Sequence, residues 1–220
     1  WVKPMRLKQL MKKMLLTRKT PKKTRANKPD RHGPMPFLIA GLGNPGSRYA
    51  ETRHNAGCWF LERLADKAGV TFRSQSKLHA QLVKTNLWGH DCILVKPDTF
   101  MNHSGQAVRA VMDYYRVDAA HLLVAYDELD LAPGVARLKL GGGHGGHNGM
   151  RDIFRHTADH DFLRLRIGIG HPGSRDAVTP YVLSRATTEQ ERLMRDAISD
   201  AVDVMPSVLE GNIPAAMKEL

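Results

Sequence analysis

The sequence predicts one α/β domain, with a twisted, mixed and largely parallel sheet flanked by helices. From residue 37 onward, short apolar segments alternate with segments whose apolar residues recur every three or four positions, and this alternation is typical of α/β folds. No long linker or internal repeat interrupts it. The segments "HAQLVKT" and "DCILVK" flank Trp88, Gly89 and His90 as the strands of a hairpin do, which adds an antiparallel part to the sheet.

Apolar patterning also predicts where the individual elements lie. Within residues 56–68, Phe60, Leu61 and Leu64 share one helical face, with Asn55 as a candidate N-cap and Gly69 at the helix end. Further helices are expected at 104–115, from Met150 onward and at about 188–209, and strands at 37–41, 79–85, 91–96, 121–126, 136–140 and 163–169. In sheets of this kind, ligands bind beyond the carboxyl ends of the strands.

The positive charge of the chain is concentrated at its beginning. The 220 residues include 33 Lys and Arg against 22 Asp and Glu, a formal net charge of +11. Residues 1–36 hold twelve of the basic residues and one acidic residue, so the two signs balance over residues 37–220. We expect residues 1–36 to be a basic, disordered extension, with Met35 as a candidate natural start. Residues 37–220 are expected to form the domain, in which a polyanion site has to be a local patch.

Hydropathy and cysteine content exclude several classes of protein. Hydrophobic residues make up 42% of the chain, and no apolar run approaches the eighteen or so residues that a membrane span needs. We therefore expect a soluble protein without a membrane partner. Cys58 and Cys92 stand in apolar segments without the spacing of a metal or redox motif. They are expected to be buried thiols in a reducing compartment.

The stretch "FLIAGLGNPG" places a strand directly before glycines 41, 43 and 46, in the G-x-G-x-x-G spacing of dinucleotide-binding loops. Such a loop needs a helix that starts at the third glycine and a carboxylate at the end of the next strand. Here a polar loop, "SRYAETRH", follows Gly46, and "HAQLVKT" ends without a carboxylate. Nicotinamide binding is therefore a minor alternative, and the glycines are expected to shape a loop that presents Asn44 at the sheet edge.

Polar side chains follow three of the expected strands. Asn44, Asn102 and Asp127 each come just past a carboxyl end, and the loops that hold His54 and Asn148 could close over the same edge. A histidine oriented by an aspartate can take a proton from water, and amide groups can hold a carbonyl and its developing oxyanion. The set predicts general-base chemistry on a carbonyl group.

Each of these residues also has a purely structural interpretation. Asn55 and Asn148 have the positions of helix N-caps, and for Asn148 we weigh capping and ligand contact equally. Asn102 could simply begin the next helix, Asn44 could stabilise a turn, and His54 could be a surface histidine.

Two other kinds of chemistry, metal-dependent and serine-dependent, have candidate residues in the sequence. Asp127, Glu128 and Asp130 could form an acidic turn or a hard-cation site, but three carboxylates in one turn are weak evidence for a metal. His144 and His147 lack a helical scaffold and a cysteine partner, so we expect no metal. Ser104 could complete a triad with His54 and Asp127. No G-x-S-x-G elbow surrounds it, and it is better explained as a helix N-cap.

Six motifs, read together, resemble the bacterial peptidyl-tRNA hydrolase family. They are "GLGNPG", "TRHNAG", "FMNHSG", "DELDL", "GGGHGGHNG" and "RLRIGIGHPG", in the family's order, and the resemblance extends from about residue 37 to the end of the sequence. It implies a monomeric, cytoplasmic, single-domain α/β enzyme without metal or other cofactor. The implied reaction is cleavage of the ester between a peptide and the terminal ribose of tRNA, which recycles tRNA from abandoned translation.

The resemblance also implies roles for individual residues. His54 is expected to be the general base, Asp127 to orient its imidazole and balance its charge, and Asn44 to orient the carbonyl and the attacking water. The residues expected to contact the substrate in the pocket are Tyr49, Phe100, Met101, Asn102, His147 and Asn148.

For the tRNA, basic residues alternate along "ARLKL" and "LRLRIGIG", so Arg137 and Lys139 share a strand face, as do Arg164 and Arg166. We expect Arg137, Lys139 and Arg166 to clamp phosphates of the acceptor end, although without the resemblance a solvated strand face would be the default. Two other functions stay open at this stage. One is a non-catalytic module that binds RNA or nucleotides, and the other is a serine-type hydrolase of small esters.

Overall fold

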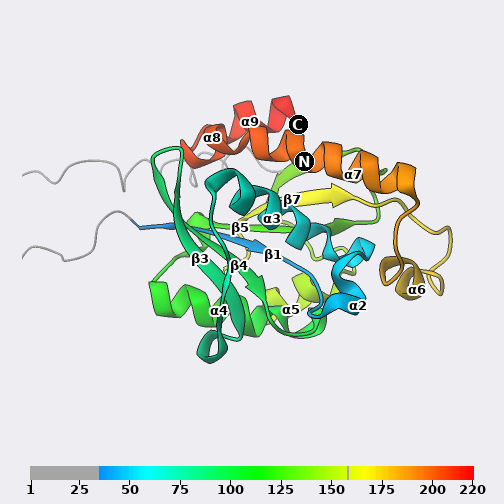
Figure 1. The fold of residues 1–220 in the computed structure, drawn as a ribbon, viewed down its shortest axis with the longest axis horizontal. Helices are drawn as coiled ribbons and strands as arrows, with labels where there is room; N and C mark the ends of the chain where they lie inside the picture. The colour runs from blue at the N-terminus through cyan, green and yellow to red at the C-terminus, as the bar shows by residue number, and fades with distance from the viewer. Residues whose placement is uncertain (1–34, 158) are drawn as a thin grey trace, which may run out of the picture.

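The computed structural model describes residues 35–157 and 159–220, which form a sheet with helices on both faces (Figure 1). Our expectation of a disordered extension over residues 1–36 therefore falls, apart from the last two residues, outside the described part of the chain. The predicted single α/β domain is confirmed.

The sheet has seven strands in the order β2-β3-β4-β1-β5-β7-β6. Its four inner strands, β4, β1, β5 and β7, run parallel, and β3 on one side and β6 on the other run antiparallel to them. The edge strand β2 pairs antiparallel with β3. The hairpin that we predicted is formed by β3 and β4. The strands are β1 (Phe37–Gly41), β2 (Arg73–Gln75), β3 (Ala80–Leu87), β4 (His90–Pro97), β5 (Leu122–Glu128), β6 (Ala136–Leu140) and β7 (Leu163–Gly168).

Two separate apolar cores hold the helices against the sheet. On one face lie α3 (Ala56–Ala68), α7 (Thr188–Asp203), α8 (Met205–Leu209) and α9 (Ile213–Glu219), and on the other lie α4 (Ser104–Tyr115) and α5 (Asn148–His156) (Figure 1). Adjacent strand residues point to opposite faces, so β1 supplies Ile39 to the first core and Leu38 to the second. The short helices α2 (Ser47–Ala50) and α6 (Val178–Val182) stand at the end of the sheet where the parallel strands finish.

The first glycines of "GLGNPG" serve close packing. A methyl group added at Gly41 would overlap the carbonyl of Gly57 in α3, and one added at Gly43 would lie 2.5 Å from the Cys58 sulfur. The loop after β1 therefore passes directly against the start of α3, which only residues without a side chain allow. This contact explains the G-x-G spacing without a dinucleotide.

Several expected boundaries were wrong. The helix expected at 188–209 is broken into α7 and α8, because Pro206 lacks an N–H group and its ring opposes continuation of the helix. The loop after Gly46, expected to be irregular, contains α2. The short elements β2, α6 and α9 were not predicted.

The two cysteines are free and buried, as expected. Burial raises the pKa of each thiol to about 12. Among the helices of the described residues, none is both long enough and apolar enough to cross a bilayer.

Candidate active site

A cavity of about 360 Å³ opens at the carboxyl ends of the parallel strands. Every pocket residue that we had predicted lines it, together with all three expected catalytic residues. They are Asn44, Tyr49, His54, Phe100, Met101, Asn102, Asp127, His147 and Asn148. The topology explains this meeting, because β1, β4 and β5 are parallel neighbours and their following residues emerge at one edge.

Asn44 is fixed by two other loops and is buried. Its main chain exchanges two hydrogen bonds with the Asn55 side chain: the Asn44 N–H donates to Oδ1 at 2.9 Å, and Asn55 Nδ2 donates to the Asn44 carbonyl at 3.0 Å. Its own Oδ1 accepts from the Met101 N–H at 2.8 Å. Because the Met101 N–H can only donate, the side-chain atom that it bonds has to be the amide oxygen of Asn44. The Asn44 NH₂ group is therefore left as a donor for a ligand.

Asn55 occupies the N-cap position of α3, as expected, but it does not cap the helix with its side chain. That side chain instead holds Asn44.

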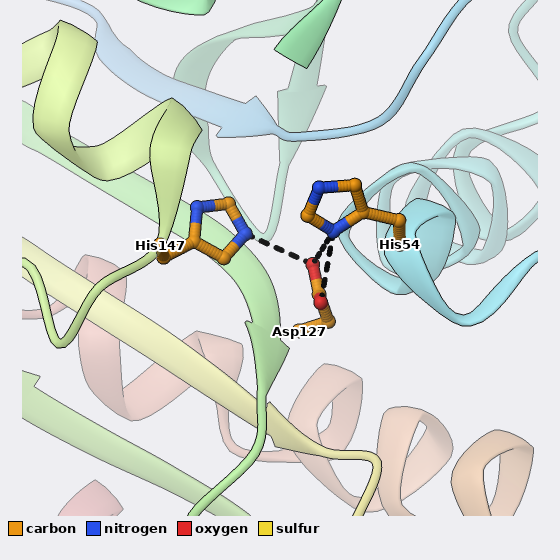
Figure 2. A group of neighbouring side chains, drawn as sticks. All are labelled: His54, Asp127 and His147. Carbon is orange, nitrogen blue, oxygen red and sulfur yellow. Dashed lines mark hydrogen bonds and ion pairs between the residues drawn. The ribbon is translucent and has the colours of Figure 1, made fainter. Parts of the chain in front are cut away.

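His54 and Asp127 form the centre of the site. His54 belongs to a single 3₁₀ turn, Arg53–Asn55, just before α3, and Asp127 lies near the end of β5. His54 Nδ1 lies 2.9 Å from both carboxylate oxygens of Asp127 (Figure 2). Because a carboxylate only accepts, Nδ1 carries the ring proton and donates, and Nε2 of the neutral ring is the basic nitrogen.

His147 approaches Asp127 from the other side (Figure 2). Its Nε2 lies 2.9 Å from Asp127 Oδ1, and its Nδ1 accepts the Met150 N–H at 3.2 Å. A backbone N–H can only donate, so the proton of the neutral ring has to be on Nε2, from which it is donated to Asp127. Asp127 therefore accepts from two imidazoles.

The same contact corrects two predictions about α5. The helix begins at Asn148, and its N-cap is His147, whose side chain bonds the Met150 N–H. We had expected a start at Met150 and had considered Asn148 as the cap. Asn148 is instead exposed in the first turn, where its Oδ1 accepts from Arg151 at 3.1 Å.

Burial and the facing rings set the charges of this group. Burial alone would raise the pKa of the Asp127 carboxyl, but His54 and His147 hold that pKa well below its usual range. Burial also opposes a charged His54, yet the attraction and hydrogen bond of Asp127 outweigh it, and the pKa of His54 is raised above its ordinary value. Asp127 is thus ionised, and His54 is a stronger base than a free imidazole.

His54, Asp127 and His147 also form the one group of potential metal ligands found within the described residues, with ligand atoms within 4.8 Å of one another. Ligation through His147 Nε2 would move its proton to Nδ1, where the Met150 N–H already points. A metal at this position would therefore break the α5 cap, so the tautomer of His147 opposes metal binding.

The remaining polar residues of the cavity differ in exposure. Asn102 is exposed in a single 3₁₀ turn, Met101–His103, where its Nδ2 lies 3.5 Å from His103 Nε2. Ser104 is buried, and its Oγ donates to the Met101 carbonyl at 2.8 Å. We had expected Ser104 to cap α4, but it is the first residue of the helix, and His103 precedes it. Its hydroxyl is thus engaged in a local turn.

The basic residues expected to bind tRNA lie beside the cavity and do not line it. Antiparallel pairing sets Arg137 opposite Arg166 and Lys139 opposite Arg164, so all four share one face, called the basic strip below. Arg166 Nε lies 2.8 Å from Glu128 Oε2, and Glu128 lines the cavity.

Arg164 is the most buried member of the strip, at 1% exposure. Its NH1 donates to the Gly143 carbonyl at 2.7 Å, while its Nε and NH2 make no hydrogen bond of ordinary geometry within the described residues. Burial lowers the pKa of this guanidinium, and Tyr126 and Glu128 partly offset the effect of burial on that pKa. Of the four cations in the strip, Arg166 is the one with an ion pair among the described residues, to Glu128, so the strip keeps a net positive charge.

Sequence reasoning missed one wall of the cavity. It is formed by Leu129 and by residues of α6 and its end: Val178, Thr179, Val182 and Leu183. The sequence "VTPYV" has a proline in its middle and too few residues for a helical period, so it contains no pattern that would have revealed this element.

A mixed α/β sheet with a histidine–aspartate pair and the oriented Asn44 amide donor beyond the ends of its parallel strands is the arrangement of a hydrolase-type α/β protein. The peptidyl-tRNA hydrolase family profile matches residues 38–220. Peptidyl-tRNA hydrolase of Acinetobacter baumannii (strain AYE) is 50% identical over 183 residues, covering 83% of this chain and 94% of that protein. The same-named protein of Stenotrophomonas maltophilia is 51% identical and covers 83% and 95%. This chain belongs to the peptidyl-tRNA hydrolase family, as its motifs predicted.

The fold agrees with solved members of the family. The crystal structure of peptidyl-tRNA hydrolase from Acinetobacter baumannii matches with a TM-score of 0.82 at 49% identity, and the match covers 86% of this chain and 95% of that one.

Proposed function

We propose that this protein hydrolyses the ester between the peptide and the terminal ribose of peptidyl-tRNA, with His54 as general base and water as nucleophile. Family membership supports the reaction. The observation that supports the mechanism is the pairing of His54 Nδ1 with Asp127 at 2.9 Å, since it leaves Nε2 of the same ring as a base in the cavity.

The steps follow from these groups. His54 Nε2 takes a proton from water, and the resulting hydroxide attacks the ester carbonyl. Asp127 stabilises the imidazolium, and the Asn44 NH₂ group donates to the carbonyl oxygen as it becomes negative. The imidazolium then returns its proton to the departing ribose oxygen. The ribose oxygen of an ester leaves far more readily than the nitrogen of an amide, so a positioned base suffices without a covalent intermediate.

Selection against aminoacyl-tRNA follows from the exposed amides of Asn102 and Asn148. A peptidyl group offers these amides the N–H and the carbonyl of its first peptide bond. A free α-ammonium offers a charge and no acyl carbonyl, so an aminoacyl group lacks the N–H and the carbonyl that these amides would bond in a peptidyl group.

The basic strip gives the acceptor end of the tRNA its counter-charge. Its net positive charge next to the cavity supports phosphate contacts by Lys139 and Arg166, with Arg137 at the exposed end. We also infer a monomer, as the resemblance to the family implies, and a cytoplasmic location, because peptidyl-tRNA arises there in translation. Sedimentation and cell fractionation test these two inferences.

The deciding experiment compares release of tRNA from an N-acetylated aminoacyl-tRNA and from its unblocked counterpart, with wild type and His54→Ala, in the presence of a chelator. We expect cleavage of the blocked substrate only, loss of cleavage in His54→Ala, and no effect of the chelator. Binding of tRNA without cleavage at any pH would instead support a binding module. A burst of acyl-enzyme that disappears in Ser104→Ala would support a serine mechanism.

A further inference from the structure

The cavity has two chemically different walls. One holds His54, Asp127 and the amides described above. The other is apolar and includes Phe100, Leu129, Val178, Val182 and Leu183. A ligand that fills the whole cavity therefore has a polar reacting end and an apolar part beside it.

Two apolar side chains of this second wall are exposed. Phe100 is 56% exposed and Leu183 is 38% exposed, and within the described residues the large apolar side chains with this much exposure are few. The fold gains little from either side chain in its exposed position. Apolar surface grouped at the mouth of a cavity that contains the reacting groups is typical of a binding surface.

Helix α6 presents this wall at regular spacing. Val178 and Val182 are four residues apart, as are Thr179 and Leu183, so adjacent edges of one short helix face the cavity. Pro180, on the same helix, is exposed and does not line the cavity.

Arg53 ties α6 to the catalytic turn. This residue precedes His54, is 5% exposed, and donates from NH1 to the carbonyls of Tyr181, Ser184 and Arg185 at 2.8–3.3 Å. Its guanidinium also stacks on the Tyr181 ring at 4.0 Å. The wall is therefore held in a set position relative to His54, as a specificity surface has to be.

We propose that the α6 wall, together with Phe100, is a side-chain subsite that favours a large apolar residue at one of the last two positions of the peptide. The proposal rests on the proposed function, because it takes the ester carbonyl to lie at His54 and Asn44. The occupant is then the part of the acyl group that extends away from the ribose. An apolar side chain there removes the exposed surface of Leu183 and Phe100 from water.

The test measures kcat/KM on one tRNA that has been acylated chemically in two series. In the first series the esterified residue is N-acetyl-leucine or N-acetyl-glycine. In the second series the esterified residue is glycine, and the residue before it is N-acetylated leucine or glycine. We expect wild type to favour leucine about tenfold in at least one series, in the range that apolar pockets achieve for small differences in side chain.

Leu183→Ser is expected to reduce that preference to about threefold or less, and Leu183→Met to retain it. Pro180→Ala is the matched control on the same helix and should keep the wild-type ratio. Because Leu183 is exposed, the serine variant should unfold at nearly the wild-type temperature, which a thermal melt checks.

Equal kcat/KM for leucine and glycine substrates in both series would overturn the subsite, and so would a preference that Leu183→Ser leaves intact. Both results still include ester cleavage, so they leave the proposed function standing. No cleavage of any blocked substrate by wild type would overturn the proposed function and the subsite with it.

Discussion

The proposed catalytic centre, formed by His54, Asp127 and His147, and the basic strip accommodate their charges in opposite ways. In the centre, Asp127 accepts from His54 and His147 and every charge has its partner within 2.9 Å. In the strip, Arg137 faces Arg166 and Lys139 faces Arg164 across β6 and β7, although like charges in such pairs destabilise a sheet. Arg164 is buried there, and two of its nitrogens make no hydrogen bond of ordinary geometry within the part of the chain that the structure describes.

The difference indicates which kind of ligand each region is suited to bind. In the centre, the charge of Asp127 is already bonded by two imidazoles, so the centre can bind a neutral ester without a charged group on the ligand. A strip that tolerates repulsion and buried positive charge gains stability when a polyanion arrives. Substitutions in the centre should therefore affect turnover, and substitutions in the strip should affect affinity and its dependence on salt.

The largest effect is expected for His54→Ala. Loss of a general base should lower kcat by about 10³-fold, within the range for acid–base catalysis, while the dissociation constant for tRNA changes less than twofold. Single-turnover cleavage and filter binding measure the two quantities. His79→Asn, at an exposed histidine that does not line the cavity, is the control. A large loss of tRNA affinity in His54→Ala would contradict the separation of the two regions.

Asp127→Asn comes next. Asp127 raises the pKa of His54, so in wild type the base becomes protonated, and kcat/KM falls, as pH drops through a value above the ordinary 6.5. Without the carboxylate, this acid limb should move to lower pH, and kcat should fall by about 10²-fold. The pH profile checks the direction, and Asp130→Asn, in the same turn but exposed, should retain the wild-type profile. If the acid limb of the pH profile moved to higher pH in Asp127→Asn, the result would contradict the proposed pairing of His54 with Asp127.

The strip is best tested through Lys139→Ala. Removing Arg166 would also leave Glu128 unpaired beside the cavity. Lys139→Ala should weaken tRNA binding, lower the slope of log affinity against log salt by about one, and leave kcat at saturation nearly unchanged. Lys218→Ala, at an exposed lysine on α9, is the control. An unchanged salt slope would remove Lys139 from the phosphate contacts.

The smallest effect on turnover is expected for Ser104→Ala. The hydroxyl donates to the Met101 carbonyl, so its loss should lower the free energy of unfolding by about 1 kcal/mol and change kcat less than about threefold. Denaturant unfolding and steady-state kinetics separate the two effects. A loss of turnover of about 10²-fold with unchanged stability would instead make Ser104 a nucleophile.

The sequence was most informative where regular strands end. Apolar strands followed at once by Asn44 and Asp127 predicted both the sheet and the edge at which these side chains meet. It was misleading where one residue type has two uses. Asn55 stands where an N-cap belongs but bonds Asn44, and His147 caps α5 at a position where asparagine is the commoner choice.

Elements that depend on tertiary contacts could not be predicted. Helix α6 has five residues and an internal proline, and the bonds from Arg53, 128 or more residues away in sequence, hold its end. Strand β2 has three exposed residues that gain their order from pairing with β3. Neither offers the periodicity on which sequence reasoning depends.

The double role of His147 makes assembly of the site conditional on a folding event. While the first turn of α5 is open, the Met150 N–H is absent from Nδ1, and either nitrogen of the ring can hold the proton. The second donor to Asp127 is then no longer guaranteed. The proton of His147 is thus fixed on Nε2, facing Asp127, only when this turn is closed. Local opening of α5 during heating should therefore stop turnover before the sheet itself unfolds.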